Sequence, residues 1–392
     1  MRGWGLWTIV FVTGAWPAAA DTPFYDRCVA LDASARLQVE ACTFALETEK
    51  LAADQQAHAL TRRATGYRGT GYWRYADADL EQAVRLAPDD PEILVAIADG
   101  ARLNANAGRA IAANKQLLEH QPKDVKALTG LGVAYMMQQN YTLAENAFSR
   151  ILALDPNNVG ALYWRAMTLG PQQEFARGLV DMDRAVALQD KNMAFRQQRG
   201  ELELYAGRFR EAITDLDLFF AAQENAPFYR FRGAAKYYLG DFQGATADFS
   251  RDLALVPAFA HLALWRYFAE QRNGGGSLEE LTAIADRTKD DWTASLIRLV
   301  TKQGSIDQAL ALAKNGNKKL QMVRESQTHF AAGEAALLAG DSAGARLQFA
   351  AAREHGVQVS TDQMVPGQPG SLPLDNVIEF SIAGARLREL KQ

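Results

Sequence analysis

The 392-residue sequence predicts an all-α protein, a right-handed solenoid of stacked helix pairs, on two observations. Small residues recur every 34 residues, with one step of 33, and a second set of small residues precedes the first by twelve positions. A fixed period of roughly 20 to 50 residues is the signature of a repeat array. Two small residues per unit allow two helices to approach closely. The first set is Ala76, Ala110, Ala144, Gly178, Ala212 and Ala245, and the second is Ala64, Ala98, Gly132, Ala166, Gly200 and Gly233.

Composition narrows the classes of partner. The chain is 48% hydrophobic and 22% charged, which is typical of a folded protein rather than a disordered one. Lys and Arg number 42 against 46 Asp and Glu, giving a net charge of −4. This balance favours no general affinity for nucleic acid or anionic membranes. We therefore expect other proteins or peptides as partners, recognised by local chemistry.

Residues 1–20 have the pattern of a cleaved secretory signal peptide. Met1-Arg2 gives a charged start, Trp4–Val12 is mostly apolar, and Ala18-Ala19-Ala20 provides small residues for cleavage. A membrane anchor is the alternative, but the apolar run is shorter than the ~20 residues that cross a bilayer. The first cysteine, Cys28, does not follow the apolar run directly, so a lipid anchor is not expected. We predict an exported protein with no membrane span.

Residues 21–56 form a helical segment with the two cysteines of the chain, Cys28 and Cys42. Fourteen residues along one continuous helix would separate them by about 21 Å, beyond the reach of a disulfide. A turn at Asp32-Ala33-Ser34 would let them pair, with Ser34 capping a helix from Ala35 to about Glu49. In an oxidising compartment, a disulfide between them is favoured over a reactive thiol or a metal site.

About six repeat units follow over residues 57–257. One of them contains Leu128, Leu131-Gly132, Tyr135, Asn140-Tyr141, Ala144, Phe148 and Pro156. This unit resembles the tetratricopeptide repeat nearly position by position. The resemblance implies a helix-turn-helix unit whose first helices line a concave, protein-binding groove.

Beyond Pro257 the period weakens, and residues 258–356 are predicted to be divergent helical repeats. A break at Arg272–Ser277 precedes helices over Leu278–Asp286 and Asp291–Leu312. A final good unit has Gly333, Gly340-Asp341, Ala345 and Phe349. We expect a loop over 357–374 and an amphipathic helix over 375–392, capped by Asp375, that covers the end of the stack.

This C-terminal third resembles a more particular family, that of the periplasmic lipoprotein NlpI. The resemblance rests on Leu262–Tyr267, Asp291-Trp292 and the unit from Glu325 to Gly340-Asp341. It implies a periplasmic homodimer that acts as an adaptor for a carboxy-terminal-processing protease and presents peptidoglycan hydrolases, also called murein hydrolases, to it. The missing lipoprotein cysteine and the added Cys28/Cys42 segment set this chain apart. An alternative function is an assembly or export component for polysaccharide or another envelope complex.

The inward positions of the consensus predict a partner-binding groove. Aromatic rings, flexible Met and amides at these positions suit an extended peptide or a partner helix. Packing between neighbouring units is the alternative role for the same side chains. The predicted groove residues are Asp99, Arg102, Thr129, Met136, Tyr163, Trp164, Gln197, Gln198, Glu201, Arg230, Tyr237 and Tyr238.

No residue pattern indicates catalysis, so the sequence predicts a protein that is not an enzyme and has no cofactor or metal. Gly66–Gly71 is rich in glycine but lies inside a helix-pair repeat with no strand before it, unlike a nucleotide-binding loop. An enzyme within Ser277–Gly356 is a third alternative, but that region lacks clustered nucleophiles, bases or ligands. The histidines have no metal-ligand spacing; they are His58, His120, His261, His329 and His355.

Overall fold

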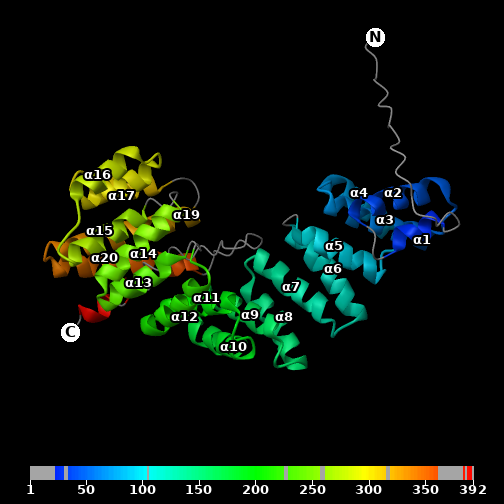
Figure 1. Cartoon of the computed structure of the whole chain (residues 1–392), viewed down its shortest axis with the longest axis horizontal. Coiled ribbons are helices and arrows are strands. Elements are labelled where there is room, and N and C mark those ends of the chain that lie inside the picture. The colour runs from blue at the N-terminus through cyan, green and yellow to red at the C-terminus, as the bar shows by residue number, and fades with distance from the viewer. Residues whose placement is uncertain are drawn as a thin grey trace, which may run out of the picture. The chain divides into compact units, whose positions relative to one another are not determined.

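The computed structural model describes residues 23–30, 34–103, 106–224, 228–256, 261–314, 318–360, 383–384 and 386–390. Throughout these ranges the regular structure is helical, which confirms the predicted all-α solenoid (Figure 1). The chain divides into two compact units, Met1–Gly100 and Ala101–Gln392. The predicted signal peptide lies outside the described residues.

The first unit holds the disulfide. Its helices are α1 (Phe24–Val29), α2 (Ala35–Thr48), α3 (Ala53–Gly69), α4 (Trp73–Leu86) and the start of α5 (Pro91–Leu103), within which the boundary falls. A disulfide joins Cys28 on α1 to Cys42 on α2, as predicted, and both cysteines are fully buried. Ser34 caps α2, because its side chain accepts a hydrogen bond from the backbone N–H of Leu37. The N-terminal segment is thus fastened to α2 before the first repeat begins.

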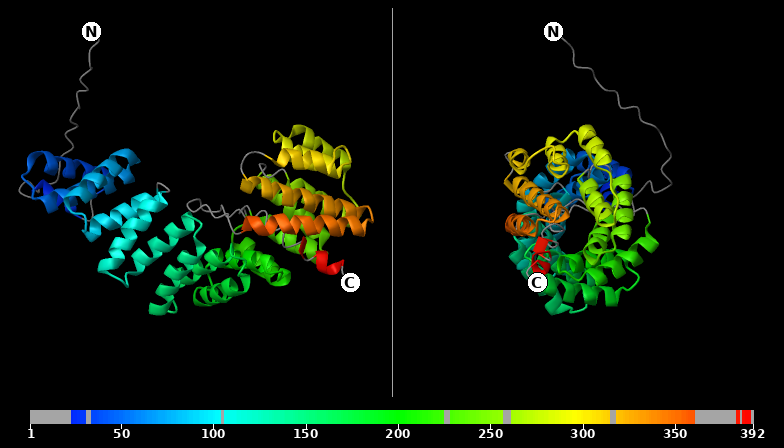
Figure 2. Two further views of the ribbon diagram at one scale, coloured as in Figure 1. Left: turned by 180° about the vertical axis from the view of Figure 1, so that it is seen from behind. Right: turned by 90° about the vertical axis from the view of Figure 1, so that its left-hand side faces the viewer.

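The second unit continues the array in antiparallel helix pairs. We call the first helix of a pair its A helix and the second its B helix. Clear pairs are α7/α8, α9/α10, α11/α12, α13/α14 and, as the two long helices that lie side by side in Figure 2, α19/α20. The bounds are α6 (Ala107–His120), α7 (Val125–Met137), α8 (Tyr141–Leu154), α9 (Val159–Leu169), α10 (Phe175–Leu188), α11 (Met193–Tyr205), α12 (Phe209–Ala222), α13 (Tyr229–Leu239), α14 (Phe242–Leu255), α15 (Leu262–Arg272), α16 (Leu278–Arg287), α17 (Asp291–Val300), α18 (Ile306–Ala313), α19 (Lys318–Leu338) and α20 (Ser342–Ser360).

The A and B helices of a pair approach closely at the small residues. A Cβ built on Gly132 of α7 would come within 2.6 Å of the Phe148 ring of α8, and one on Gly333 of α19 within 2.7 Å of the Phe349 ring of α20. In each case a large residue sixteen positions downstream fills the space that glycine leaves. The register of small residues in the sequence therefore marks the crossing point of each pair.

The turn from the A helix to the B helix uses a left-handed residue at nearly the same repeat position. Glycine, which adopts a positive φ at no steric cost, occupies most of these positions. Gln139 and Gln173, both with φ 60°, occupy the turns after α7 and α9. The glycines are Gly71, Gly207, Gly240 and Gly340.

Two boundaries in the C-terminal region differ from the sequence prediction. The helix expected over Asp291–Leu312 is two helices, because α17 ends at Val300 and Lys302 takes φ 61° before α18 begins at Ile306. Residues 357–360, expected to begin a loop, belong instead to α20, which continues to Ser360. Residues 361–382, including Asp375, lie outside the described residues, while 383–384 and 386–389 are helical. We call the described residues 383–384 and 386–390 the C-terminal helix.

None of the helices that the structure describes has the length and apolar character that a membrane span requires.

Candidate protein-binding surface

A recurring ion pair fixes how each A helix lies against its B helix. In four pairs an arginine on the A helix donates through its guanidinium to both carboxylate oxygens of an aspartate sixteen residues later. The aspartates are buried, so the two-pronged contact is shielded from water. We call these pairs the arginine ladder: Arg63–Asp79, Arg165–Asp181, Arg199–Asp215 and Arg232–Asp248.

The arginine ladder also joins neighbouring helix pairs. Arg199 on α11 reaches Asp183 on the preceding α10 at 3.0 Å. Arg232 on α13 reaches Asp217 on α12 at 2.7 Å. The hydrogen bond to Asp215 raises the pKa of Arg199, against the lowering effect of burial. In α7/α8 the same positions are taken by buried Leu131 and Ala147, so an apolar contact replaces the ion pair there.

One acid beside the arginine ladder, Glu203, has a cation near only one of its two carboxyl oxygens. Glu203 lies one helical turn after Arg199, and the two side chains are 4.0 Å apart. Its Oε2 is buried and has no hydrogen-bond partner in the described part of the chain. Burial and the charge of Asp215 raise the pKa of Glu203 to about 8. Glu203 therefore holds its proton at neutral pH.

Seven of the predicted groove residues remain at least partly accessible. Asp99 and Arg102 are exposed on α5. Half-buried side chains follow on the next A helices, at Thr129 of α7, Tyr163 and Trp164 of α9, Gln198 of α11 and Tyr238 of α13.

Tyr163 and Trp164 also pack between neighbouring units, which was the alternative role. The Tyr163 ring lies 5.5 Å from that of Phe195 on α11, and the Trp164 ring stacks 6.3 Å from that of Phe148 on α8. Burial and the charge of Glu201 raise the pKa of Tyr163 to about 12, so its hydroxyl stays protonated. The two rings form a rigid aromatic surface with open edges, held by packing from both sides.

Five predicted groove residues are buried and offer no open surface. The Arg230 guanidinium pairs with Asp252 of α14 at 3.2 Å. Gln197 donates a hydrogen bond to Glu201 on the same helix. Met136 of α7 is in the core. Tyr237 of α13 is completely buried, so it cannot meet a partner as predicted.

Tyr237 instead belongs to a cluster that sequence reasoning missed. Its hydroxyl donates to Glu334 Oε2 of α19 at 2.6 Å, across 97 residues of sequence. Arg386 of the C-terminal helix and Arg272 of α15 also approach Glu334. The only sequence signal was the good repeat around Gly333, which places residue 334 at an inward position equivalent to Glu201.

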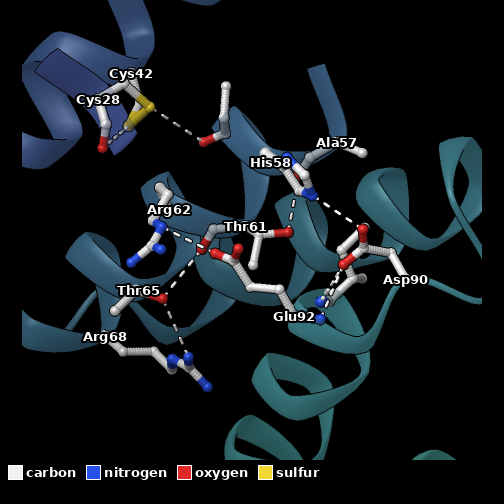
Figure 3. A network of polar contacts seen from close by, with 12 residues as sticks. Cys28, Cys42, Ala57, His58, Thr61, Arg62, Thr65, Arg68, Asp90 and Glu92 are labelled. Atoms are coloured by element: carbon white, nitrogen blue, oxygen red, sulfur yellow. Dashed lines mark hydrogen bonds and ion pairs between the residues drawn. A yellow bond between two sulfur atoms is a disulfide. The ribbon is translucent and has the colours of Figure 1, made fainter. Parts of the chain in front are cut away.

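In the first unit, polar contacts fasten α3 to the start of α5 (Figure 3). His58 Nε2 lies 2.9 Å from Asp90 Oδ2, and Arg62 Nε lies 2.9 Å from Glu92 Oε1. Asp90 Oδ1 caps α5 by accepting from the backbone N–H groups of Glu92 and Ile93. Burial alone would raise the pKa of Asp90, but the His58 contact and these N–H groups lower it overall. His58 has a structural role here.

Within the described residues, no group of three or more His, Cys, Asp or Glu side chains could hold a metal ion. The arrangement offers contacts on the A helices, with aromatic rings, amides and hydroxyls. Such a surface can bind a peptide or a helix through noncovalent contacts, with no chemical reaction involved.

Comparison with known proteins agrees with this geometry. The family model described as "Tetratricopeptide repeat" matches residues 125–158, which comprise α7 and α8. Residues 125–158 are therefore a tetratricopeptide repeat. Human tetratricopeptide repeat protein 13 is 29% identical over 132 residues, which is 32% of this chain and 15% of that protein. The chain therefore spans only a small part of this relative.

Two solved structures are similar in fold. A tetratricopeptide repeat protein from Parabacteroides merdae has 20% identity, covers 59% of this chain and 91% of its own, and gives a TM-score of 0.48. The structure described as pilF of Pseudomonas aeruginosa has 17% identity, covers 52% and 94%, and gives a TM-score of 0.44.

Proposed function

We propose that this tetratricopeptide-repeat protein is a periplasmic, non-enzymatic adaptor that binds a segment of a partner protein along its A helices. The observation that carries the proposal is the partly open row of Thr129, Tyr163, Trp164 and Gln198 on α7, α9 and α11. Rigid aromatic rings with polar neighbours are the groups that dominate the energy of protein interfaces. The arginine ladder holds α9 and α11 in fixed register against their B helices, so this part of the surface is preorganised and loses little entropy on binding.

The compartment and the partner are further parts of the proposal. The buried Cys28–Cys42 disulfide suits an oxidising compartment. The signal-peptide pattern of residues 1–20 and the resemblance to the NlpI family point to the periplasm. On that resemblance, the partners are a carboxy-terminal-processing protease and peptidoglycan hydrolases.

Site-specific photocrosslinking in cells tests the surface and the partner together. A photoreactive phenylalanine analogue replaces Tyr163, and Val180 of α10, a B-helix residue that is 68% exposed, serves as the matched control. We expect Tyr163 to capture a discrete protein and Val180 to capture none. Capture at Val180 alone would place binding on the opposite face. Recovery of polymer-export components instead of a protease or hydrolase would support the export alternative.

A further inference from the structure

The side chain of Glu334 is an ionisable group buried at the inner side of α19, with no exposed surface. Tyr237 donates to its Oε2, Arg386 Nε lies 3.3 Å from its Oε1, and Arg272 Nη2 lies 3.4 Å from its Oε2. A carboxylate taken wholly out of water is stable only when charges and donors surround it. Glu334 therefore requires a guanidinium at this place.

The C-terminal helix supplies one of the two guanidinium groups beside Glu334, and Arg272 of α15 supplies the other. Ala383 is fully buried in the same apolar cluster as Tyr237, and Leu387 and Leu390 pack against this cluster. Arg386 is buried too, with its guanidinium carbon 5.5 Å from the centre of the Tyr237 ring. The C-terminal helix thus packs its apolar residues against the cluster that contains Tyr237 and directs one arginine to Glu334.

The residues that receive the C-terminal helix occupy inward positions of the repeats. Tyr237 and Tyr238 were predicted to line a groove for an extended peptide or a partner helix, and the guanidinium of Arg386 lies over both rings, at 5.5 Å and 6.0 Å. Glu334 occupies the equivalent inward position of the last repeat. The chain's own helix is seated where a foreign helix was expected.

We propose that the surface of α13, α15 and α19 around Glu334 is a receptor for an arginine-bearing amphipathic helix, and that the C-terminal helix is its built-in ligand, which an arginine-bearing helix of a partner protein replaces. The proposal rests on the adaptor function, because that function supplies the partner protein. It adds a second contact to the partner, between an arginine of the partner helix and Glu334. Loss of Arg386 without replacement would leave the buried Glu334 carboxylate with the guanidinium of Arg272 but without the one at its Oε1, so a guanidinium from a partner helix restores the lost contact. Lysine is a poor substitute, because it lacks the planar fork that stacks on Tyr237 while reaching the carboxylate.

A peptide-exchange experiment on the full chain tests the proposal. Arg386→Gln frees the receptor, and Arg388→Gln, an exposed residue of the same helix, is the matched control. The probe is a fluorescent synthetic peptide of residues 376–392, and binding is followed by anisotropy. We expect the peptide to bind Arg386→Gln at least tenfold more tightly than the wild type or Arg388→Gln.

Variant peptides distinguish recognition of the arginine from nonspecific binding. The peptide carrying Arg386→Gln should bind at least tenfold more weakly than the native peptide, and the peptide carrying Arg388→Gln should bind like the native one. Adding Glu334→Gln to the Arg386→Gln protein should abolish the difference between peptides. Circular dichroism and the melting temperature establish that each variant is folded. Arg386→Lys keeps the charge and is a milder variant, which should also bind the peptide.

Equal binding to the wild type and Arg386→Gln, or equal binding of the native and Arg386→Gln peptides, would overturn the receptor. This result is independent of the crosslinking at Tyr163. Failure here leaves the adaptor surface of α7, α9 and α11 standing, whereas failure of that crosslinking leaves the exchange at Glu334 measurable.

Discussion

The ion pair between Arg165 and Asp181 can be replaced by the apolar pair that stands one repeat earlier. This replacement tests whether apolar side chains can substitute for one ion pair of the arginine ladder. Thirty-four residues upstream, Leu131 and Ala147 occupy the same positions. Arg165 Nη2 lies 2.7 Å from Asp181 Oδ1, and the side chain of Asp181 is only 5% exposed while that of Arg165 is 27% exposed. The chain thus contains both an ionic and an apolar solution of one packing problem.

The two single substitutions should differ in cost. Arg165→Leu leaves the Asp181 carboxylate buried with no cation, which costs about 3 to 5 kcal/mol of unfolding free energy. Asp181→Ala leaves Arg165 able to turn toward water, so its loss should be about 1 to 2 kcal/mol. The double variant restores an apolar pair and should lie within about 1 kcal/mol of the wild type.

Urea denaturation of the oxidised protein, with the four chains compared at one pH, gives the double-mutant cycle. The expected coupling energy between Arg165 and Asp181 is at least about 3 kcal/mol, because the two single costs sum to about 4 to 7 kcal/mol and the double variant costs at most about 1 kcal/mol. If the double variant is as destabilised as the sum of the single variants, the apolar pair does not substitute for the ion pair. The reasoning from internal repeats would then be refuted.

Three further predictions concern single positions. Gly132→Ala should lower the unfolding free energy by roughly 2 kcal/mol, because the new methyl overlaps the Phe148 ring; an unchanged melting temperature would contradict this. Gln139→Gly should raise the unfolding free energy by about 1 kcal/mol by relieving the left-handed residue, whereas Gln138→Gly, at a residue with φ −89°, should not raise it in the same urea titration. Glu203→Gln should remove a pH dependence of the unfolding free energy. The folded chain keeps the proton of Glu203 up to about pH 8, while the unfolded chain releases it at a lower pH. The unfolding free energy of the wild type therefore falls as the pH rises between these two values. At pH 9 the variant should be more stable by up to roughly 5 kcal/mol, and parallel pH profiles for the two proteins would refute the assignment.

The repeat architecture could be predicted because its determinants are local and periodic. Gly132 and Phe148 are close enough in sequence for their fixed spacing to be visible, and the spacing corresponds to a real crossing of α7 and α8. The arginine ladder has an equally regular signal, an Arg and an Asp sixteen residues apart, which could have been recognised from the same alignment of repeats. The break between α17 and α18 had no such signal, because it depends on a left-handed Lys302.

The binding surface was less predictable, because consensus positions give the direction of a side chain and not what lies opposite it. Tyr163 stays partly open. Tyr237 has the same kind of position but is covered, since Glu334 and Arg386 come from 97 and 149 residues further along the chain. No periodicity in the sequence encodes a contact at that separation.

The gap in the arginine ladder affects how the array would come apart. From α8 to α14, Arg165, Arg199 and Arg232 each grip the helix before and the helix after, so adjacent hairpins share charged contacts. In a quasi-one-dimensional protein such nearest-neighbour coupling sets the length of chain that melts as one block. The hairpin α7/α8 lacks this arginine, and its ion pair with the next hairpin joins Glu145 of α8 to Arg177 of α10, whose side chain is exposed. Because salt screens exposed ion pairs more than buried ones, raising the ionic strength should loosen the link between α8 and α10 before the buried pairs of the arginine ladder, and hydrogen exchange should increase there first.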